Sequence, residues 1–403
     1  MTVVAAPSLR LSPRDRARLI ATDLLAGIAA AAVTLPQAMA FGVALFVPLG
    51  TDAAAGAFAG LIGAAAASLC SALAGGTRGL ISAPTGPMLV LLGAAAASLT
   101  AAGVEGAGVF AGLAAVMLVS GVVLRVLGLT GGGRLIKFMP YPVIAGFMTG
   151  SGILMVMSQF DAVIGSGVDE FWSAWRWLPS GAAVAAIAAM YYLPKKFPRL
   201  PNTIAGLVVG TAAFHLLTLS APQAFPRAWV IGALPGIDSL HAGVSLAALR
   251  GLPLSVVVGS GLALALLASL DTLLTSVVAD VNTGARHDAR RELLGQGAGQ
   301  MCAALLGGMA GAGTTGATLV AVKTGGRRWS GAFAGATFAL LVLWIGPVGN
   351  LLPISVLAGI IIYVAWAMLE RDLLVWLRTP GARMDAGIAL LVTTVTVAYD
   401  LMI

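Results

Sequence analysis

Threonine, glycine and proline gather in two short polar stretches of an otherwise apolar chain. The first is GGTRGLISAPTGP at 75–87, and the second is GGMAGAGTTGATL at 307–319. In hydrocarbon every backbone N–H and C=O needs a partner, so irregular backbone survives only where it is buried in protein or faces a watery cavity. Breaks of this kind at corresponding places of an internal repeat are typical of a transporter's binding site.

The two stretches are related by an offset of 232 residues. The identical pairs are Cys70/Cys302, Ala72/Ala304, Leu73/Leu305, Gly75/Gly307, Gly76/Gly308 and Gly79/Gly311. A second echo follows, because PYPVIAG at 140–146 resembles PISVLAG at 353–359. The chain therefore reads as a duplication whose most irregular backbone lies at matching places in the two halves.

Close helix packing is the alternative explanation of these glycines. It leaves unexplained why Pro84 and Pro87 bracket Thr85, and why Thr314 and Thr315 are adjacent. We therefore favour a binding site, with packing as the competing interpretation.

The composition excludes most soluble functions. Of 403 residues, 59% are hydrophobic and only 10% are charged, which indicates a polytopic helical membrane protein. The net charge of +7 fits basic residues held on the cytoplasmic side rather than nucleic-acid binding. The sequence has no metal cluster, nucleophile–base pair or nucleotide fingerprint, so we expect no enzyme activity, no catalytic residue, no metal and no cofactor beyond a coupled H⁺ or Na⁺.

The apolar segments predict an all-α protein with fourteen spans, seven in each half. An odd number of spans per half forces the second half upside down, which is an inverted repeat. The predicted units are a cytoplasmic segment at 1–18, a first repeat at 19–220, a connecting segment at 221–252 and a second repeat at 253–403. The predicted spans, numbered 1 to 14, are 19–45, 53–74, 85–100, 107–127, 136–157, 180–194, 202–219, 253–279, 293–306, 316–323, 331–348, 354–369, 372–378 and 384–403. We read 158–179 as an interfacial segment on the outer side.

Spans 3 and 10 both begin at a broken stretch, so their N-termini should meet near the midplane. Unpaired N–H groups and two positive dipole ends then converge, which makes an anion site without a charged side chain. The hydroxyls of Thr85, Thr314, Thr315 and Thr318 could add donors.

Asp271 is the acidic residue that lies deepest in a predicted span. Placing an ionisable acid inside the membrane costs free energy, so the default hypothesis is a proton or sodium coupling site. The alternative is a structural acid bonded to Thr272, Thr275 or a helix N-terminus. Span 8 corresponds to span 1, which places Asp271 near Gln37.

Gln37 offers donors and acceptors beside Pro36, which we expect to interrupt span 1. Gln37 could instead be a polar clasp between helices. Phe41, one turn later, walls the pocket or packs in the core. Glu105, Glu170, Glu292 and Glu370 fall at span ends, where we expect them to be solvated.

Several of these motifs resemble the SulP anion transporters, the sulfate permease relatives of prestin and pendrin. The resemblance rests on TLPQAMAF in span 1, GGTRGLISAPTGP before span 3, SLDTLLTSVVADVNTGARHDARRELLGQGAGQM around span 8 and the stretch ending at TGGRR. It covers the whole membrane portion.

The resemblance implies the seven-plus-seven inverted-repeat fold shared with uracil permeases. Spans 1–4 and 8–11 would form a mobile core, and spans 5–7 and 12–14 a gate that also makes homodimers. The implied substrate-binding residues are Gln37, Phe41, Thr85, Gly86, Thr314, Thr315, Gly316, Ala317 and Thr318, with Asp271 as the coupling residue.

Three features depart from the family pattern. Many animal members have an arginine where this chain has Ala317, which makes the site less positive and halide binding less expected. Some bacterial members have a glutamate at Gln37. Members usually continue into a cytoplasmic STAS domain, and this chain stops at Ile403, so we expect the natural protein to be longer.

We therefore expect a secondary active transporter of the bacterial inner membrane with both termini in the cytoplasm. Proton-coupled symport of a small anion by alternating access is the leading hypothesis, with a dicarboxylate such as fumarate, sulfate or bicarbonate as substrate. The alternatives are a nucleobase permease of the same fold and an uncoupled, channel-like anion conductor. The expected partners are the anion, the lipid membrane and a second copy, and no nucleic acid.

Overall fold

The computed structural model describes residues 13–132, 140–164, 178–198, 200–219, 229–235, 251–344, 346–370 and 372–401. Three expectations fall wholly or largely outside this part of the chain. They concern residues 1–12 of the cytoplasmic segment, residues 165–177 of the interfacial segment with Glu170, and most of the connecting segment at 221–252.

The first half of the chain is helical apart from one two-residue strand. Its elements are α1 (Pro13–Phe46), η1 (Val47–Leu49), α2 (Ala53–Ala74), β1 (Ser82–Ala83), α3 (Gly86–Ala101), α4 (Ala107–Thr130), α5 (Tyr141–Met157), α6 (Phe160–Ile164), α7 (Leu178–Lys196) and α8 (Asn202–Leu219).

The described second half is also helical apart from one two-residue strand. Its elements are α9 (Leu254–Thr283), α10 (Ala289–Leu305), β2 (Ala312–Gly313), α11 (Thr315–Lys323), α12 (Ser330–Trp344), η6 (Gly346–Leu351), α13 (Ile354–Met368), α14 (Leu373–Arg378), η7 (Pro380–Ala382) and α15 (Arg383–Leu401).

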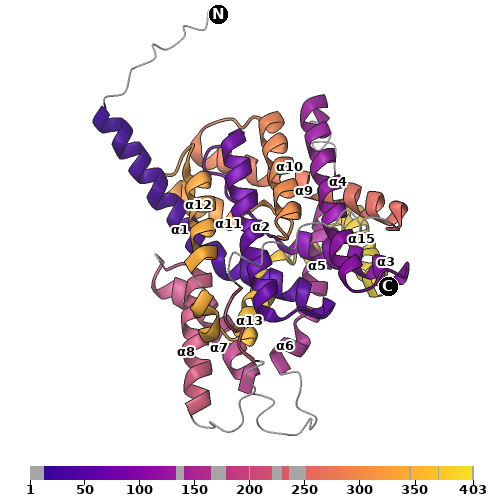
Figure 1. Cartoon of the computed structure of the whole chain (residues 1–403). Coiled ribbons are helices and arrows are strands. Elements are labelled where there is room, and N and C mark those ends of the chain that lie inside the picture. The colour runs from indigo at the N-terminus through magenta and orange to yellow at the C-terminus, as the bar shows by residue number, and fades with distance from the viewer. Residues whose placement is uncertain are drawn as a thin grey trace, which may run out of the picture.

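The helices pack in two groups. In the first group α2 packs on α1, α10 and α12, and α4 packs on α9 and α10. In the second group α13 packs on α5, α7 and α8, and α15 packs on α5. Figure 1 shows α10 and α12 toward the top and α6, α7 and α8 toward the bottom. Helices of each group come from both halves of the sequence.

Six helical segments of the described chain are long and apolar enough to cross a membrane. They are Ala17–Leu49, Ala53–Ala74, Ala107–Thr130, Tyr141–Ile164, Asn202–Leu219 and Leu254–Thr283. Shorter apolar helices lie at Gly86–Ala101, Ser330–Trp344 and Ile354–Met368. The multi-span helical character is therefore confirmed, while the count of fourteen spans stays a prediction.

The expected break of the first span at Pro36 is wrong, because α1 continues through it. Proline removes one helical hydrogen bond and crowds the preceding turn. Hydroxyls of neighbouring side chains can satisfy the carbonyls freed in this way. The carbonyl that Pro36 frees is that of Ala32. Beside it, the Thr203 hydroxyl of α8 donates to the Val33 carbonyl over 2.8 Å, and the Thr34 hydroxyl donates to the Ala30 carbonyl over 2.9 Å.

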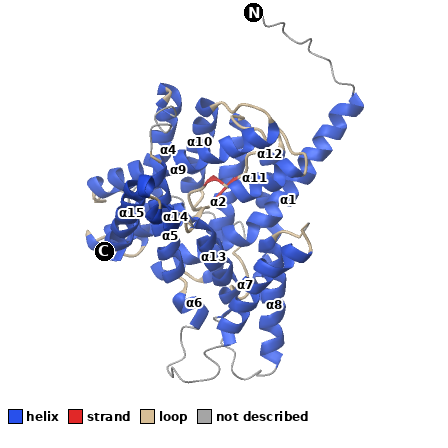
Figure 2. Ribbon diagram, turned by 180° about the vertical axis from the view of Figure 1, so that it is seen from behind, coloured by secondary structure: helices blue, strands red, loops and turns tan. Residues whose placement is uncertain are grey.

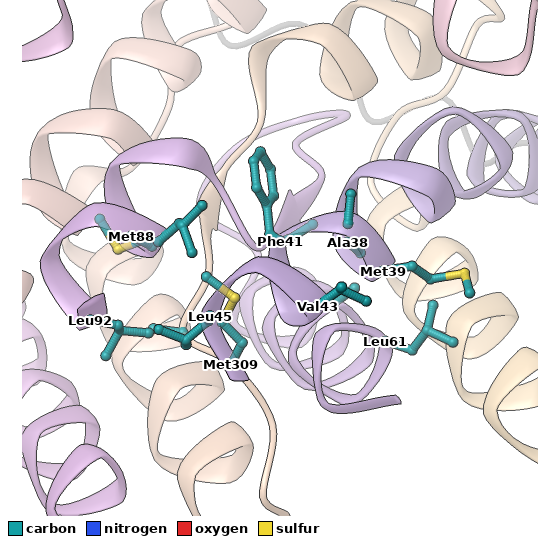
Figure 3. Close-up of a cluster of buried hydrophobic side chains, with 14 of the residues drawn as sticks. Ala38, Met39, Phe41, Val43, Leu45, Leu61, Met88, Leu92 and Met309 are labelled. Carbon is teal, nitrogen blue, oxygen red and sulfur yellow. The ribbon is translucent and has the colours of Figure 1, made fainter. Parts of the chain in front are cut away.

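Glycines allow α1 and α2 to approach each other closely. A Cβ at Gly60 would overlap the Ala38 carbonyl oxygen, and a Cβ at Gly42 would overlap that of Gly56. This is small-residue packing of the kind that holds membrane helices together. Figure 3 shows Met39 and Val43 of α1 near Leu61 of α2, while Phe41 points to another side of α1. The packing fixes the rotation of α1 and so the direction in which Phe41 points.

Candidate anion-binding cavity

A cavity of about 390 Å³ lies where the two broken stretches meet α1, α5, α8, α9 and α13. Nine of the ten residues singled out from the sequence line it, and the exception is Thr318. The lining residues are Val33, Gln37, Phe41, Pro84, Thr85, Gly86, Pro87, Met148, Pro201, Asn202, Asp271, Gly313, Thr314, Thr315, Gly316, Ala317, Val320, Tyr363, Val364, Ala367 and Met368.

The two broken stretches pair with each other as strands. β1 and β2 run antiparallel, with Ser82 opposite Gly313 and Ala83 opposite Ala312. Figure 2 shows this small red pair inside the blue helices. Because each strand leads directly into a helix, the pairing brings the N-termini of α3 and α11 to the same cavity.

The helix starts leave backbone donors without helical acceptors. Thr85 and Thr314 are the N-caps of α3 and α11, and the first N–H groups of a helix have no partner within it. On α11 these are the N–H groups of its first turn, Thr315 to Ala317. On α3, Pro87 has no N–H, so its first turn offers one donor fewer.

Hydroxyl protons of α11 are engaged within the protein, contrary to the expectation that they point to an anion. The Thr314 hydroxyl donates to the Ile81 carbonyl over 3.0 Å. The Thr275 hydroxyl donates to the Gly313 carbonyl over 3.0 Å and also contacts the Thr315 hydroxyl at 2.9 Å. Since a hydroxyl has one proton, Thr315 must be the donor to Thr275.

Thr318 stands behind the cavity wall. Its side chain is fully buried, and its hydroxyl accepts the N–H of Ile81 over 3.1 Å. Thr318 therefore holds the first broken stretch against α11 and does not face the cavity.

Thr85 and Asp271 are neighbours in the lining of the cavity. The Asp271 carboxylate interacts with the Thr85 hydroxyl. Neither Thr85 Oγ1 nor Asp271 Oδ2 makes a hydrogen bond of normal geometry with a described residue, although both atoms are buried. Buried polar atoms without partners are costly, so these two atoms mark where a bound species would be held.

The alternative in which Thr272 and Thr275 satisfy Asp271 is not what the structure shows. The Thr272 hydroxyl accepts the N–H of Gly313 over 3.1 Å, and Thr275 donates to the carbonyl of the same residue. Both threonines therefore fasten β2 to α9. Among the cavity-lining residues in the described part of the chain, Asp271 alone has a carboxyl side chain, and none has a basic one.

A buried amide network supports the broken stretches from behind. The Ser82 hydroxyl donates to Gln296 Oε1 over 3.0 Å. The Nε2 atoms of Gln296 and Gln300 donate to the Gly311 carbonyl at 2.7 and 3.3 Å. Glu292, one turn before Gln296, is 1% exposed, so the expectation that it is solvated is wrong. It lies in the first turn of α10, packed against Gly76.

Sequence reasoning missed the wall built by α5, α8 and α13. Its residues are Met148, Pro201, Asn202, Tyr363, Val364, Ala367 and Met368. The echo of PYPVIAG in PISVLAG lies at the starts of α5 and α13, but apolar helices give no signal about which face meets a cavity on another group of helices.

Residues 20–392 match the model of the sulfate permease family. The chain belongs to the sulfate permease family. This family comprises transporters rather than enzymes. The bicarbonate transporter BicA of a Picosynechococcus strain is 32% identical over 386 residues, covering 90% of this chain and 65% of its own length. BicA of a Synechocystis strain is 32% identical over 375 residues, covering 87% of this chain and 62% of its own length.

Solved structures show the same fold. The transmembrane domain of a cyanobacterial BicA superimposes with a TM-score of 0.81 at 30% identity, over 96% of this chain and 97% of that chain. SLC26A9 superimposes with a TM-score of 0.69 at 17% identity, over 96% of this chain and 65% of that chain. The chain therefore corresponds to the membrane domain of these proteins and spans less than two thirds of the length of the two BicA relatives.

Proposed function

We propose that this chain is the membrane part of a secondary active transporter that carries a small anion together with a cation. The observation that supports this most is the meeting of two helix N-termini with the Asp271 carboxylate in a single cavity, where its Oδ2 atom makes no hydrogen bond of normal geometry with a described residue. The helix ends attract an anion, whereas Asp271 repels it. The repulsion disappears when a proton or a sodium ion neutralises Asp271, so binding of the cation favours binding of the anion.

A monovalent anion such as bicarbonate fits the charge of the cavity best. Each helix N-terminus contributes about half a positive charge, and no lysine or arginine is among the lining residues that the structure describes. Two helix ends therefore balance about one negative charge. The names of the BicA relatives point to the same anion, while sulfate and fumarate carry a second charge that the cavity does not match.

The finer architecture belongs to the same proposal. We infer fourteen spans in a seven-plus-seven inverted repeat, in a bacterial inner membrane and with both termini in the cytoplasm. The group that holds α1–α4 and α9–α12 would move as a core against the group that holds α5–α8 and α13–α15, and the gate would form the homodimer. The pairing of β1 with β2 supports the repeat, because it joins corresponding segments of the two halves.

The test is uptake of radiolabelled bicarbonate, sulfate, fumarate and uracil into proteoliposomes, with an inward proton gradient, an inward sodium gradient or neither. We expect one anion to accumulate above equilibrium with one of the gradients. Asp271→Asn should abolish gradient-driven accumulation, because a neutral amide does not take up a proton and lacks the negative charge that attracts sodium. Asp161→Asn, the same change at an exposed position of α6, should leave uptake unchanged.

Other outcomes would contradict the proposal. Accumulation of uracil alone would assign the protein to the nucleobase permeases. Anion flux that never exceeds equilibrium would indicate a channel-like conductor. Gradient-driven accumulation that persists in Asp271→Asn would remove the coupling role from Asp271.

A further inference from the structure

A second hollow of about 550 Å³ continues along the same helices as the anion cavity. On α1, Phe41 lines the anion cavity and Leu45, one turn later, lines the second hollow. On α3, Gly86 lines the first and Leu89 the second. The remaining lining residues are Ala44, Pro48, Leu49, Val90, Gly93, Ala96, Ala97, Thr100, Ala101, Leu154, Met155 and Ser158. The two hollows therefore lie end to end between α1, α3 and α5.

Met155 of α5 separates the two hollows. It lines the second hollow and is 1% exposed. A Cβ added at Gly86 would overlap the Met155 Sδ atom and would lie 3.1 Å from Sδ of Met368. The two methionine sulfurs, from α5 and α13, thus close around the first residue of α3.

The other side of the anion cavity has a different boundary. A hollow of about 480 Å³ lies there, between α7, α8 and α13. Asn202, Tyr363 and Ala367 line both this hollow and the anion cavity. Lys195 is part of its lining, which provides a positive charge beside the route. The anion cavity thus shares polar residues with the hollow between α7, α8 and α13. Methionine side chains separate it from the second hollow.

We propose that Met155, seated on Gly86, is the gate between the anion cavity and the second hollow. This inference rests on the proposed transport function. A thioether offers an anion no hydrogen-bond donor, so passing it would require the anion to give up water without compensation. Methionine has three rotatable bonds and adapts to changing neighbours. It can therefore seal against a glycine when α5 rests on α3 and withdraw when the two helices separate.

The second hollow lies at the C-terminal end of α1, which is remote from the basic loop at 323–328. At the other end of α1, the Asp23 carboxylate accepts the backbone N–H groups of Arg327 and Trp329, next to Lys323 and Arg328. The Met155 gate is thus the one on the face opposite this basic loop, which positive-inside charge bias assigns to the cytoplasm.

Thiol labelling tests the gate without requiring transport. In a chain in which Cys70 and Cys302 are serine, single cysteines replace Gly93 in the second hollow or Gly316 in the anion cavity. Both glycines have open space where a Cβ would be added. An impermeant anionic methanethiosulfonate is applied to intact cells and, separately, to inverted membrane vesicles.

We expect the cysteine at 93 to react from outside the cell at the same rate in all backgrounds. The cysteine at 316 should react from outside about tenfold faster in Met155→Ala than with Met155 present, because the truncation removes the seal. Met155→Leu, which refills the space, should restore the slow rate. Met157→Ala, at a 46% exposed position of the same helix, should not change it.

The gate is refuted if Met155→Ala leaves the rate of labelling at position 316 from outside the cell unchanged. It is also refuted if the cysteine at 93 reacts only in inverted vesicles. Absence of any gradient-driven anion uptake by the unmodified protein would overturn the transport proposal instead. The labelling rates and the uptake assay can therefore fail independently.

Discussion

The two broken stretches occupy equivalent places in the repeat but present different chemistry to the cavity. At α3 the Thr85 hydroxyl interacts with Asp271 and makes no hydrogen bond of normal geometry with a described residue, and Pro87 removes an N–H. At α11 the hydroxyls of Thr314 and Thr315 are bonded within the protein, and the first turn keeps all its N–H groups. Under the proposed function the α3 end would serve Asp271 and the coupled cation, and the α11 end would serve the anion.

Glycine at the start of each helix should show the largest difference between the two ends. Gly86→Ala pushes a methyl group into the Met155 and Met368 side chains, whereas a Cβ at Gly316 meets no atom within 4 Å. Overpacking costs about 1–3 kcal/mol, so we expect Gly86→Ala to reduce the rate of uptake by roughly tenfold to a hundredfold. Gly316→Ala should leave the maximal rate nearly intact and raise the KM for the anion, because its methyl group occupies the cavity.

Initial rates of uptake over a range of anion concentrations check this prediction. Expression and the thermal unfolding temperature in detergent serve as the folding control for both variants. Equal losses at the two glycines would show that the ends are not specialised in this way.

Removal of one hydroxyl at each end should show that the α3 end affects the cation dependence of uptake and the α11 end does not. Thr85→Val takes away the oxygen beside Asp271, so the concentration of H⁺ or Na⁺ needed for half-maximal uptake should change by roughly tenfold, the effect of about 1.4 kcal/mol. Thr315→Val breaks the bond to Thr275, which lowers the free energy of unfolding by about 1 kcal/mol and leaves the cation dependence unchanged. Cation titrations of uptake together with thermal melts distinguish the two variants.

The smallest expected effect comes from making α3 more like α11. Pro87→Ala restores a backbone N–H in the first turn of α3, at a residue that lines the cavity. One further backbone hydrogen bond is worth about 1 kcal/mol net, or roughly fivefold in affinity. Isothermal titration with the transported anion should therefore show a lower Kd. An unchanged or higher Kd would mean that the α3 terminus does not contribute to the anion site.

Much of the site could be predicted from sequence because the signals are local. The glycine- and proline-rich stretches identify irregular backbone within apolar surroundings, and the offset of 232 residues relates them. An acid within an apolar span is visible without a structure. These features named Thr85, Asp271, Thr314 and Thr315, all of which line the cavity.

Hydrogen-bond direction and helix continuity could not be predicted in the same way. Whether Thr315 donates to an anion or to Thr275 depends on where α9 lies. The hydroxyl that bonds the Val33 carbonyl beside Pro36 comes from Thr203, 170 residues away in the sequence. The burial of Glu292 depends on the close approach of Gly76. Each outcome is set by a partner distant in the chain.

The sequence by itself determined a multi-span helical membrane protein of the sulfate permease family, with two helix starts and Asp271 as the chemical elements of its site. Composition and local backbone restrictions suffice for that, because lipid permits few alternatives. Only the tertiary structure decided which polar atoms remain unpartnered and where Met155 closes the cavity. Those properties arise from side chains of separate helices competing for the same space and the same hydrogen bonds.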